Sequence, residues 1–132
     1  MEITLDWRGD HRFVTETESG VEVVLDGSRE EGITPMESLL SALAGCMAID
    51  IVDILTKGRE ALEECRIVAR GTRRDDPPRR FTSIGLAVEL VGTDLSRAKA
   101  ERAIRLSREK YCSVWHTLVP DLEMDVEIEI RS

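Results

Sequence analysis

The feature that most constrains the fold is a long apolar segment that carries the signals of a single α-helix. Thr34 suits the cap position, Pro35 suits the first helical residue, and Glu37 completes a capping box with Thr34. The helical period continues as far as Lys57 and Gly58. Large apolar side chains recur at Leu39, Leu40, Leu43, Met47, Ile51, Ile54 and Leu55. This spacing predicts one long helix around which the rest of the chain folds.

A second face of the predicted helix carries only small residues: Ala42, Ala44, Gly45 and Ala48. Small side chains let another backbone approach closely, so we expect this helix to be central and buried on most sides. Asp50 and Asp53 interrupt its longest apolar run, which we therefore expect to fall short of the roughly 18 residues of a membrane span. No membrane is expected as a partner.

Alternating apolar and polar residues predict strands before and after this helix. Three strands with tight turns precede it, at residues 3–7, 12–17 and 21–26, and suggest an antiparallel meander. Three more follow, around residues 64–70, 82–90 and 122–130.

A second helix is expected from about Leu95 to Tyr111, capped near Asp94, with a short helical turn at residues 113–118. Its predicted apolar side is formed by Ala100, Ala103, Ile104, Ser107 and Tyr111. The order βββ-α-ββ-α-β is typical of an α+β fold with helices packed on antiparallel sheet. At 132 residues we expect a single domain covering residues 1–132.

Composition excludes several classes of protein. The net charge of −8 argues against nucleic acid as a partner, because neutralising phosphates dominates that affinity. The first residues lack the basic and apolar regions of a signal peptide, so we expect a cytoplasmic protein whose thiols stay reduced. With only His11 and His116 as histidines, no zinc spacing is recognisable. No metal and no cofactor is expected.

The three cysteines differ in their surroundings. Cys46 lies inside the apolar helix, where burial disfavours the thiolate, and Asp50 one turn later opposes it further. Cys112 ends a basic run, and His116 follows four residues later. Cys65 alternates with core-facing residues and is interpreted as packing. Cys46 and Cys112 can meet only through the tertiary fold, so a two-thiol redox site and two packing cysteines both remain open.

Several segments together resemble the OsmC/Ohr superfamily, particularly its YhfA-like branch. They are residues 35–40 and 44–50 around Cys46, residues 106–107 and 109–114 around Cys112, and residues 80–84 before the fifth strand. The resemblance implies an OsmC-like fold with antiparallel sheets packed around a long central helix, in an intertwined homodimer. It also implies hydroperoxide reduction at the subunit interface, with Cys46 as the peroxidatic cysteine and Cys112 as the resolving cysteine.

The resemblance also indicates where supporting residues belong. Characterised peroxidases of this superfamily carry a glutamate directly after the helix-opening proline, where this sequence has Met36. They also use an N-terminal arginine to hold the reactive thiolate. Glu37, Arg8 and Arg12 are therefore candidate supporting residues, together with Asp50 and His116, which lie near the two cysteines in the sequence.

Two functions follow as hypotheses. The first is a thiol-dependent reductase of small organic hydroperoxides, reset by an external dithiol. The alternative, which Met36 favours, is a non-catalytic OsmC-like dimer that binds a small apolar ligand or partner and keeps its cysteines for packing.

Overall fold

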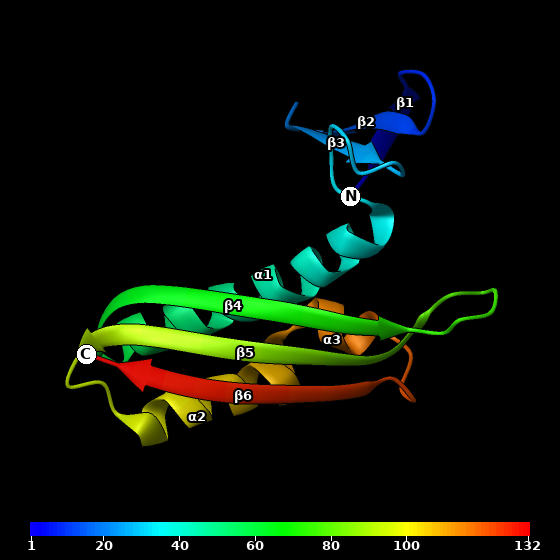
Figure 1. Cartoon of the computed structure of the whole chain (residues 1–132). Coiled ribbons are helices and arrows are strands. Elements are labelled where there is room, and N and C mark those ends of the chain that lie inside the picture. Colours follow the sequence, from blue (N-terminus) through cyan, green and yellow to red (C-terminus); the bar gives the residue numbers. More distant parts are fainter. The chain divides into compact units, whose positions relative to one another are not determined.

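The computed structural model describes all 132 residues, which form two compact units, Met1–Leu39 and Leu40–Ser132. Figure 1 labels the elements along the chain. In chain order they are β1 (Ile3–Trp7), β2 (Arg12–Thr17), β3 (Glu22–Asp26), α1 (Pro35–Lys57), β4 (Ala61–Arg73), β5 (Phe81–Thr93), α2 (Arg97–Leu106), the π-helical turn η1 (Ser107–Tyr111), α3 (Ser113–Thr117) and β6 (Glu123–Arg131).

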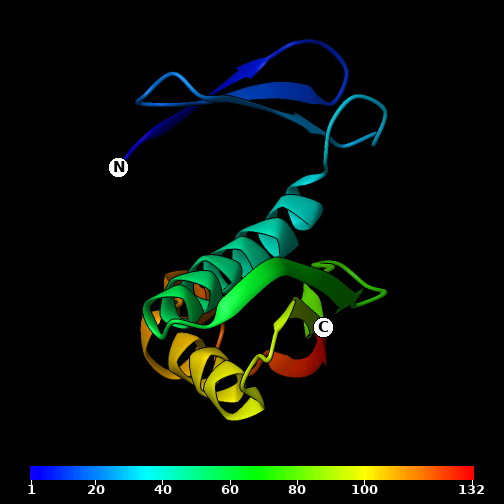
Figure 2. The same ribbon diagram turned by 90° about the vertical axis from the view of Figure 1, so that its left-hand side faces the viewer.

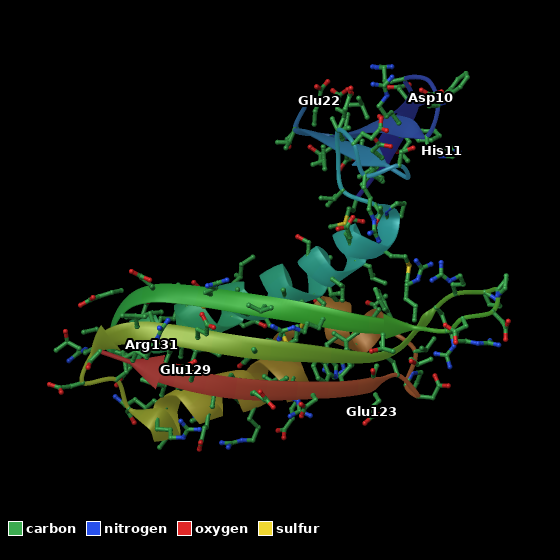
Figure 3. All side chains as sticks on the ribbon, viewed as in Figure 1. Asp10, His11, Glu22, Glu123, Glu129 and Arg131 are labelled. Carbon is green, nitrogen blue, oxygen red and sulfur yellow. The ribbon has the colours of Figure 1, made fainter.

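The N-terminal unit is built on an antiparallel sheet with the order β1-β2-β3, so the predicted meander is confirmed. Its first turn contains Gly9 at a φ of 99°, which a residue without a Cβ adopts without strain, and Asp10 and His11 follow in that turn (Figure 3). The second turn contains Gly20 at a φ of 87°.

One face of this small sheet is apolar and exposed. Cross-strand pairing places Trp7 opposite Phe13, and Phe13 opposite Leu25, so all three side chains share a face. Trp7 is 66% exposed and Leu5, opposite Thr15, is 50% exposed. Every residue of β1 is exposed in the single chain, although its alternating pattern predicts one covered face, because nothing within the unit covers that face.

The loop between β3 and α1 is organised by a buried carboxylate. Asp26 is 1% exposed, and its two oxygens accept from the backbone N–H groups of Ser28 over 2.8 Å and Glu31 over 3.0 Å. These hydrogen bonds lower the pKa of Asp26 because they favour its charged form. The loop therefore leads to the start of α1 in a fixed conformation.

The capping box at the start of α1 is confirmed. The backbone N–H of Glu37 donates to Thr34 Oγ1 over 3.1 Å, and the backbone N–H of Thr34 donates to Glu37 Oε1 over 3.0 Å. The observed helix, Pro35–Lys57, has the predicted bounds.

From Leu40 onward α1 belongs to the C-terminal unit, where one stripe of it is buried. Leu43, Met47 and Ile51 are 0% exposed and Leu55 is 2% exposed, each one helical turn after the last. Other positions, among them Ile49, are exposed, so the expectation of a helix buried on most sides is wrong for the single chain.

Length and composition alone would let α1 cross a membrane, so the expectation that its apolar run is too short is also wrong. The core helix of a soluble protein meets the same criterion. Here the buried stripe, and a hydrogen bond that Asp50 accepts from the Ser107 hydroxyl just after α2, tie the helix into the C-terminal unit.

The second sheet has the order β4-β5-β6. β4 pairs with β5 antiparallel, whereas β6 pairs with β5 parallel, so this sheet is mixed rather than purely antiparallel. The difference arises because the chain returns from β5 to β6 through α2, η1 and α3, and such a crossover brings the next strand in parallel. The predicted α+β fold is confirmed.

Helices cover one face of this sheet. Figures 1 and 2 show α2 and the part of α1 in this unit on the same side of β4, β5 and β6. On β6, Glu123 and Glu129 are exposed (Figure 3). The buried core contains the α1 stripe with Phe81, Ile84, Leu86, Val88, Leu90, Ala100, Ala103, Ile104, Cys112 and Leu122.

The second helix differs from its prediction. It begins after Ser96, whose hydroxyl accepts from the backbone N–H of Lys99 over 3.2 Å, and not near Asp94. It ends at Leu106, where the π-helical turn η1 begins. The prediction continues the α-helical spacing as far as Tyr111, but the π-helical turn has a different spacing. The assignment of Tyr111 to the apolar side is therefore wrong, and its side chain is 48% exposed.

Replacing Thr34 by alanine should lower the free energy of unfolding by about 1 kcal/mol, because an N-cap hydrogen bond is lost. Urea denaturation of wild type and Thr34→Ala measures this difference. Thr34→Ser keeps the hydroxyl and is the matched control. Equal stability of Thr34→Ala and wild type would contradict the role given to the capping box.

Candidate active site

Cys46 lies on α1 beside the buried stripe and is half-buried. The helix surface on its open side is small or apolar: Ala42 is exposed and Ile49 is 65% exposed. A Cβ added to Gly45 would meet no other atom within 4 Å, so the helix surface at Gly45, the residue before Cys46, is open in the single chain. The Cys46 thiol is therefore the more accessible member of the candidate pair.

Cys112 lies at the end of the π-helical turn η1 and is 0% exposed. Its backbone N–H donates to the carbonyl of Ser107 over 2.8 Å, which is the five-residue spacing of a π-helix. Cys112 is also the N-cap of α3, and its Sγ accepts from the backbone N–H of Trp115 over 3.3 Å. The orientation of this thiol is thus fixed from both sides.

The fold brings the two thiols together. Burial raises the pKa of Cys112 to about 11, the Trp115 N–H opposes this rise, and the neighbouring Cys46 thiol adds to it. The carboxylate of Asp50 raises the pKa further, because it opposes a second negative charge nearby. Cys112 is therefore a protonated thiol at neutral pH, in contact with Cys46.

Asp50 and Ser107 connect the two helical segments next to the thiols. Asp50 lies one turn after Cys46 on α1, and its Oδ2 accepts from Ser107 Oγ over 2.7 Å. Ser107 is 0% exposed and is the first residue of η1. Asp50, one of the predicted supporting residues, thus contacts the segment that ends at Cys112.

The other predicted supporting residues are Glu37, Arg8 and Arg12 in the N-terminal unit and His116 in the C-terminal unit. Glu37 is engaged in its capping box, and Arg12 forms an ion pair with Glu31 over 2.6 Å. Arg8, Arg12 and Glu37 all lie in the N-terminal unit, whereas the cysteines lie in the other. The backbone N–H of His116 donates to the Cys112 carbonyl over 3.2 Å, while its side chain is exposed. No cation is among the groups that shift the pKa of Cys112.

Sequence reasoning missed two contributors, Ser107 and Trp115. The sequence places Ser107 on the apolar face of a predicted helix. A buried hydroxyl needs a hydrogen-bond partner, so a serine at this position could have indicated a polar contact in the core. Trp115 contributes through its backbone, which no side-chain pattern could reveal. Its ring also lies against a guanidinium, since Cζ of Arg108 is 5.1 Å from the ring centroid.

Cys65 lies apart from this pair, on β4 opposite Leu90 of β5. Burial raises the pKa of the Cys65 thiol, which keeps it protonated and suits the packing role predicted for it. No group of three or more histidine, cysteine or carboxylate side chains is arranged to hold a metal ion.

A cavity of about 520 Å³ adjoins the site at Asp50. Asp50, Asp53 and Lys57 of α1 line it together with Arg102 and Tyr111. Neither thiol lines this cavity, so it is a neighbour of the thiol pair rather than its entrance.

Comparison with known proteins gives a consistent picture. The model of the family described as OsmC-like protein matches residues 26–128. The chain is 42% identical to Protein YhfA of Escherichia coli (strain K12) over 115 residues, which is 86% of each chain.

Two solved structures illustrate the range of structural similarity. A hypothetical protein from Aquifex aeolicus VF5 is 30% identical, with a TM-score of 0.90 over 99% of this chain and 96% of that one. The organic hydroperoxide resistance protein OhrB of Bacillus subtilis is 16% identical, with a TM-score of 0.66 over 98% of each chain. The second likeness is one of fold alone.

The raised pKa of Cys112 predicts how stability depends on pH. The folded state holds this proton more tightly than the unfolded chain, so the stabilisation is complete below the ordinary thiol pKa of about 8.5 and is lost as pH rises toward 11. Urea denaturation between pH 8 and pH 11 should show a fall in stability that is shallower in Cys112→Ala. An unchanged slope in that variant would contradict the prediction, and Thr34→Ser serves as a control with all thiols intact.

Proposed function

The chain belongs to the OsmC-like protein family, and we propose that it is a thiol-dependent reductase of organic hydroperoxides that uses Cys46 and Cys112. The observation that carries this proposal is the contact between the two thiols, which come from segments 66 residues apart in the sequence. Two packing cysteines have no need to meet. A pair in contact can form a disulfide after a small movement.

The unequal surroundings of the thiols support the order of their roles. Cys46 is half-buried and borders an open side of α1, so it can meet a peroxide first. Cys112 is fully buried and protonated, which makes it a poor first nucleophile. Cys46 is therefore proposed as the peroxidatic cysteine and Cys112 as the resolving cysteine.

The proposed reaction has three steps. The Cys46 thiolate attacks the peroxide oxygen, the O–O bond breaks, and the alcohol leaves as Cys46 becomes a sulfenic acid. Cys112 then attacks the Cys46 sulfur, the S–O bond breaks, and water leaves as the disulfide forms. An external dithiol reduces this disulfide to two thiols and becomes a disulfide itself.

The apolar surface beside Cys46 favours an organic peroxide over hydrogen peroxide. Ile49 follows Cys46 by three residues and Ala42 precedes it by four, so both share its side of α1. An alkyl or aryl group would gain by covering them. The structural neighbours that are named for organic hydroperoxide resistance support the same substrate class.

One observation favours a second candidate function. Met36 occupies the position where the resemblance places a catalytic glutamate, and Glu37 is held by the backbone of Thr34. Met36 has no charged group, and the Glu37 carboxylate is already engaged in the capping box. The chain would then be a non-catalytic dimer that binds a small apolar ligand or partner. Consumption of cumene hydroperoxide with loss of two thiols per chain separates the two functions.

We further propose that the working form is an intertwined homodimer in the cytoplasm, in which residues 1–132 act as one domain. The exposed apolar face of β1, β2 and β3 and the exposed side of α1 both need cover that the single chain does not supply. A partner that covers α1 would place the site at the subunit interface. A reducing compartment suits three free cysteines.

Cysteine variants test the reaction. Cys46→Ser should abolish consumption of cumene hydroperoxide, because the other thiol of the pair, Cys112, is fully buried. Cys112→Ser should allow one turnover per chain and leave a sulfenic acid on Cys46 that dimedone traps and mass spectrometry detects. Cys65→Ser is the matched control and should consume peroxide as wild type does. Equal consumption by wild type and Cys46→Ser would remove the enzymatic proposal.

A charge on the apolar face of β1 tests the dimer. Leu5→Asp should shift the protein toward monomer in light scattering at micromolar concentration, because a buried unpaired charge opposes association. Thr4→Asp adds the same charge to the opposite face of the strand and should leave the dimer intact. A wild-type protein that is monomeric and folded would end this proposal.

A further inference from the structure

Ser107 connects the backbone of Cys112 to the helix that carries Cys46. Its hydroxyl donates to Asp50 Oδ2 over 2.7 Å, and its carbonyl accepts from the backbone N–H of Cys112 over 2.8 Å. Asp50 stands one turn after Cys46 on α1. These links close a ring of four residues. One turn of α1 joins Cys46 to Asp50, two hydrogen bonds join Asp50 to Ser107 and Ser107 to Cys112, and the contact between the thiols joins Cys112 to Cys46.

The packing at this position would accept a residue without a hydroxyl. Ser107 is 0% exposed, and two other fully buried positions on the same side of α2 are Ala100 and Ala103. An alanine would fill nearly the same volume. What the serine adds is the bond to Asp50, and bonds with a charged partner are stronger than neutral ones.

The π-helical turn is the element on which this bond acts. A π-helical turn is rare, occurs mostly as a single turn inserted in a helix, and is frequent at functional sites. In η1 it brings Ser107 and Cys112, five residues apart, to the same buried side. A turn of this kind keeps its position only where tertiary contacts hold it, and the Ser107 hydroxyl supplies a contact to α1.

We propose that Ser107, anchored by Asp50, is a positioning residue for the condensation of Cys112 with oxidised Cys46, an inference that rests on the proposed function. In this step the Cys112 sulfur bonds to the Cys46 sulfur, the S–O bond of the sulfenic acid breaks, and the hydroxide leaves as water with the Cys112 proton. Disulfide geometry is specific, so the rate depends on how Cys112 is held. Ser107 has no part in the first attack on the peroxide.

The test separates the two steps in time. One equivalent of cumene hydroperoxide is mixed with reduced protein, and dimedone added at intervals measures the sulfenic acid that remains. In Ser107→Ala the peroxide should be consumed within about twofold of the wild-type rate, while the disulfide should form on the order of 10-fold more slowly or worse. Ser113→Ala, next to Cys112 but exposed and without a side-chain hydrogen bond, should match wild type in both steps.

Variants of Asp50 distinguish positioning from a general loss of stability. Asp50→Ala removes the same hydrogen bond from the other side, and it also removes the charge that opposes the Cys112 thiolate, so it should slow condensation less than Ser107→Ala does. The double variant should be no slower than Ser107→Ala, because the two substitutions remove the same hydrogen bond. Asp50→Asn loses the charge as Asp50→Ala does but keeps an oxygen that can accept from Ser107, so it should condense faster than Asp50→Ala, and this matched pair also tests the bond if Ser107→Ala does not fold.

Two results would overturn the inference: wild-type condensation in Ser107→Ala, or additive losses in the double variant. A wild-type protein that consumes no peroxide would instead refute the proposed function. The inference is then tested with diamide, a diazene that adds to one thiol and is displaced as a hydrazine by the second. Slower closure in Ser107→Ala would support the positioning role, and equal closure would end it.

Discussion

The site depends on how α1 is rotated against its sheet. Leu43, Met47, Ile51 and Leu55 recur every fourth residue and are all buried, so the helix can turn by only a few degrees without exposing them. In this orientation of the helix, Cys46 lies at the edge of the stripe. One side of the Cys46 side chain faces the core and the other side is open. The stripe thus decides that this thiol is half-buried.

A second constraint acts on the other thiol through the end of α2. Residues five apart on an α-helix point about 140° away from each other, whereas a π-helical turn, whose hydrogen bond joins residues five apart, brings them closer to one side. Ser107 and Cys112 are five apart and both fully buried, in agreement with the π-helical turn between them. The intervening Tyr111 is correspondingly turned outward. One local change of helix type therefore brings a hydroxyl and a thiol to the same side of the chain.

These two constraints explain what the sequence could and could not predict. The periodic pattern and the capping box of α1 predicted its bounds, because burial of one face imposes the pattern directly. The bounds of β2 at Arg12–Thr17 followed from the polar turns on either side of it. The end of α2 was misjudged because an inserted residue breaks the period that the prediction extended. The parallel pairing of β6 depends on the path of the crossover, and alternation within a strand carries no sign of direction. The exposure of Trp7 could not be predicted from the sequence pattern. Alternation shows that a strand has an apolar face, but it does not show whether the same chain or a partner covers that face.

The unequal environments of the thiols also set a direction for the chemistry. A buried, protonated Cys112 is unreactive toward peroxide, yet as an attacking thiol it needs only to lose its proton once Cys46 has become an electrophile. The Trp115 N–H that donates to its sulfur would then stabilise the developing negative charge, in opposition to burial and to Asp50. Asp50 consequently has two opposing effects: its charge keeps Cys112 protonated, and its hydrogen bond to Ser107 keeps Cys112 in place. An arrangement of this kind protects the resolving thiol from premature oxidation while holding it ready for the second step.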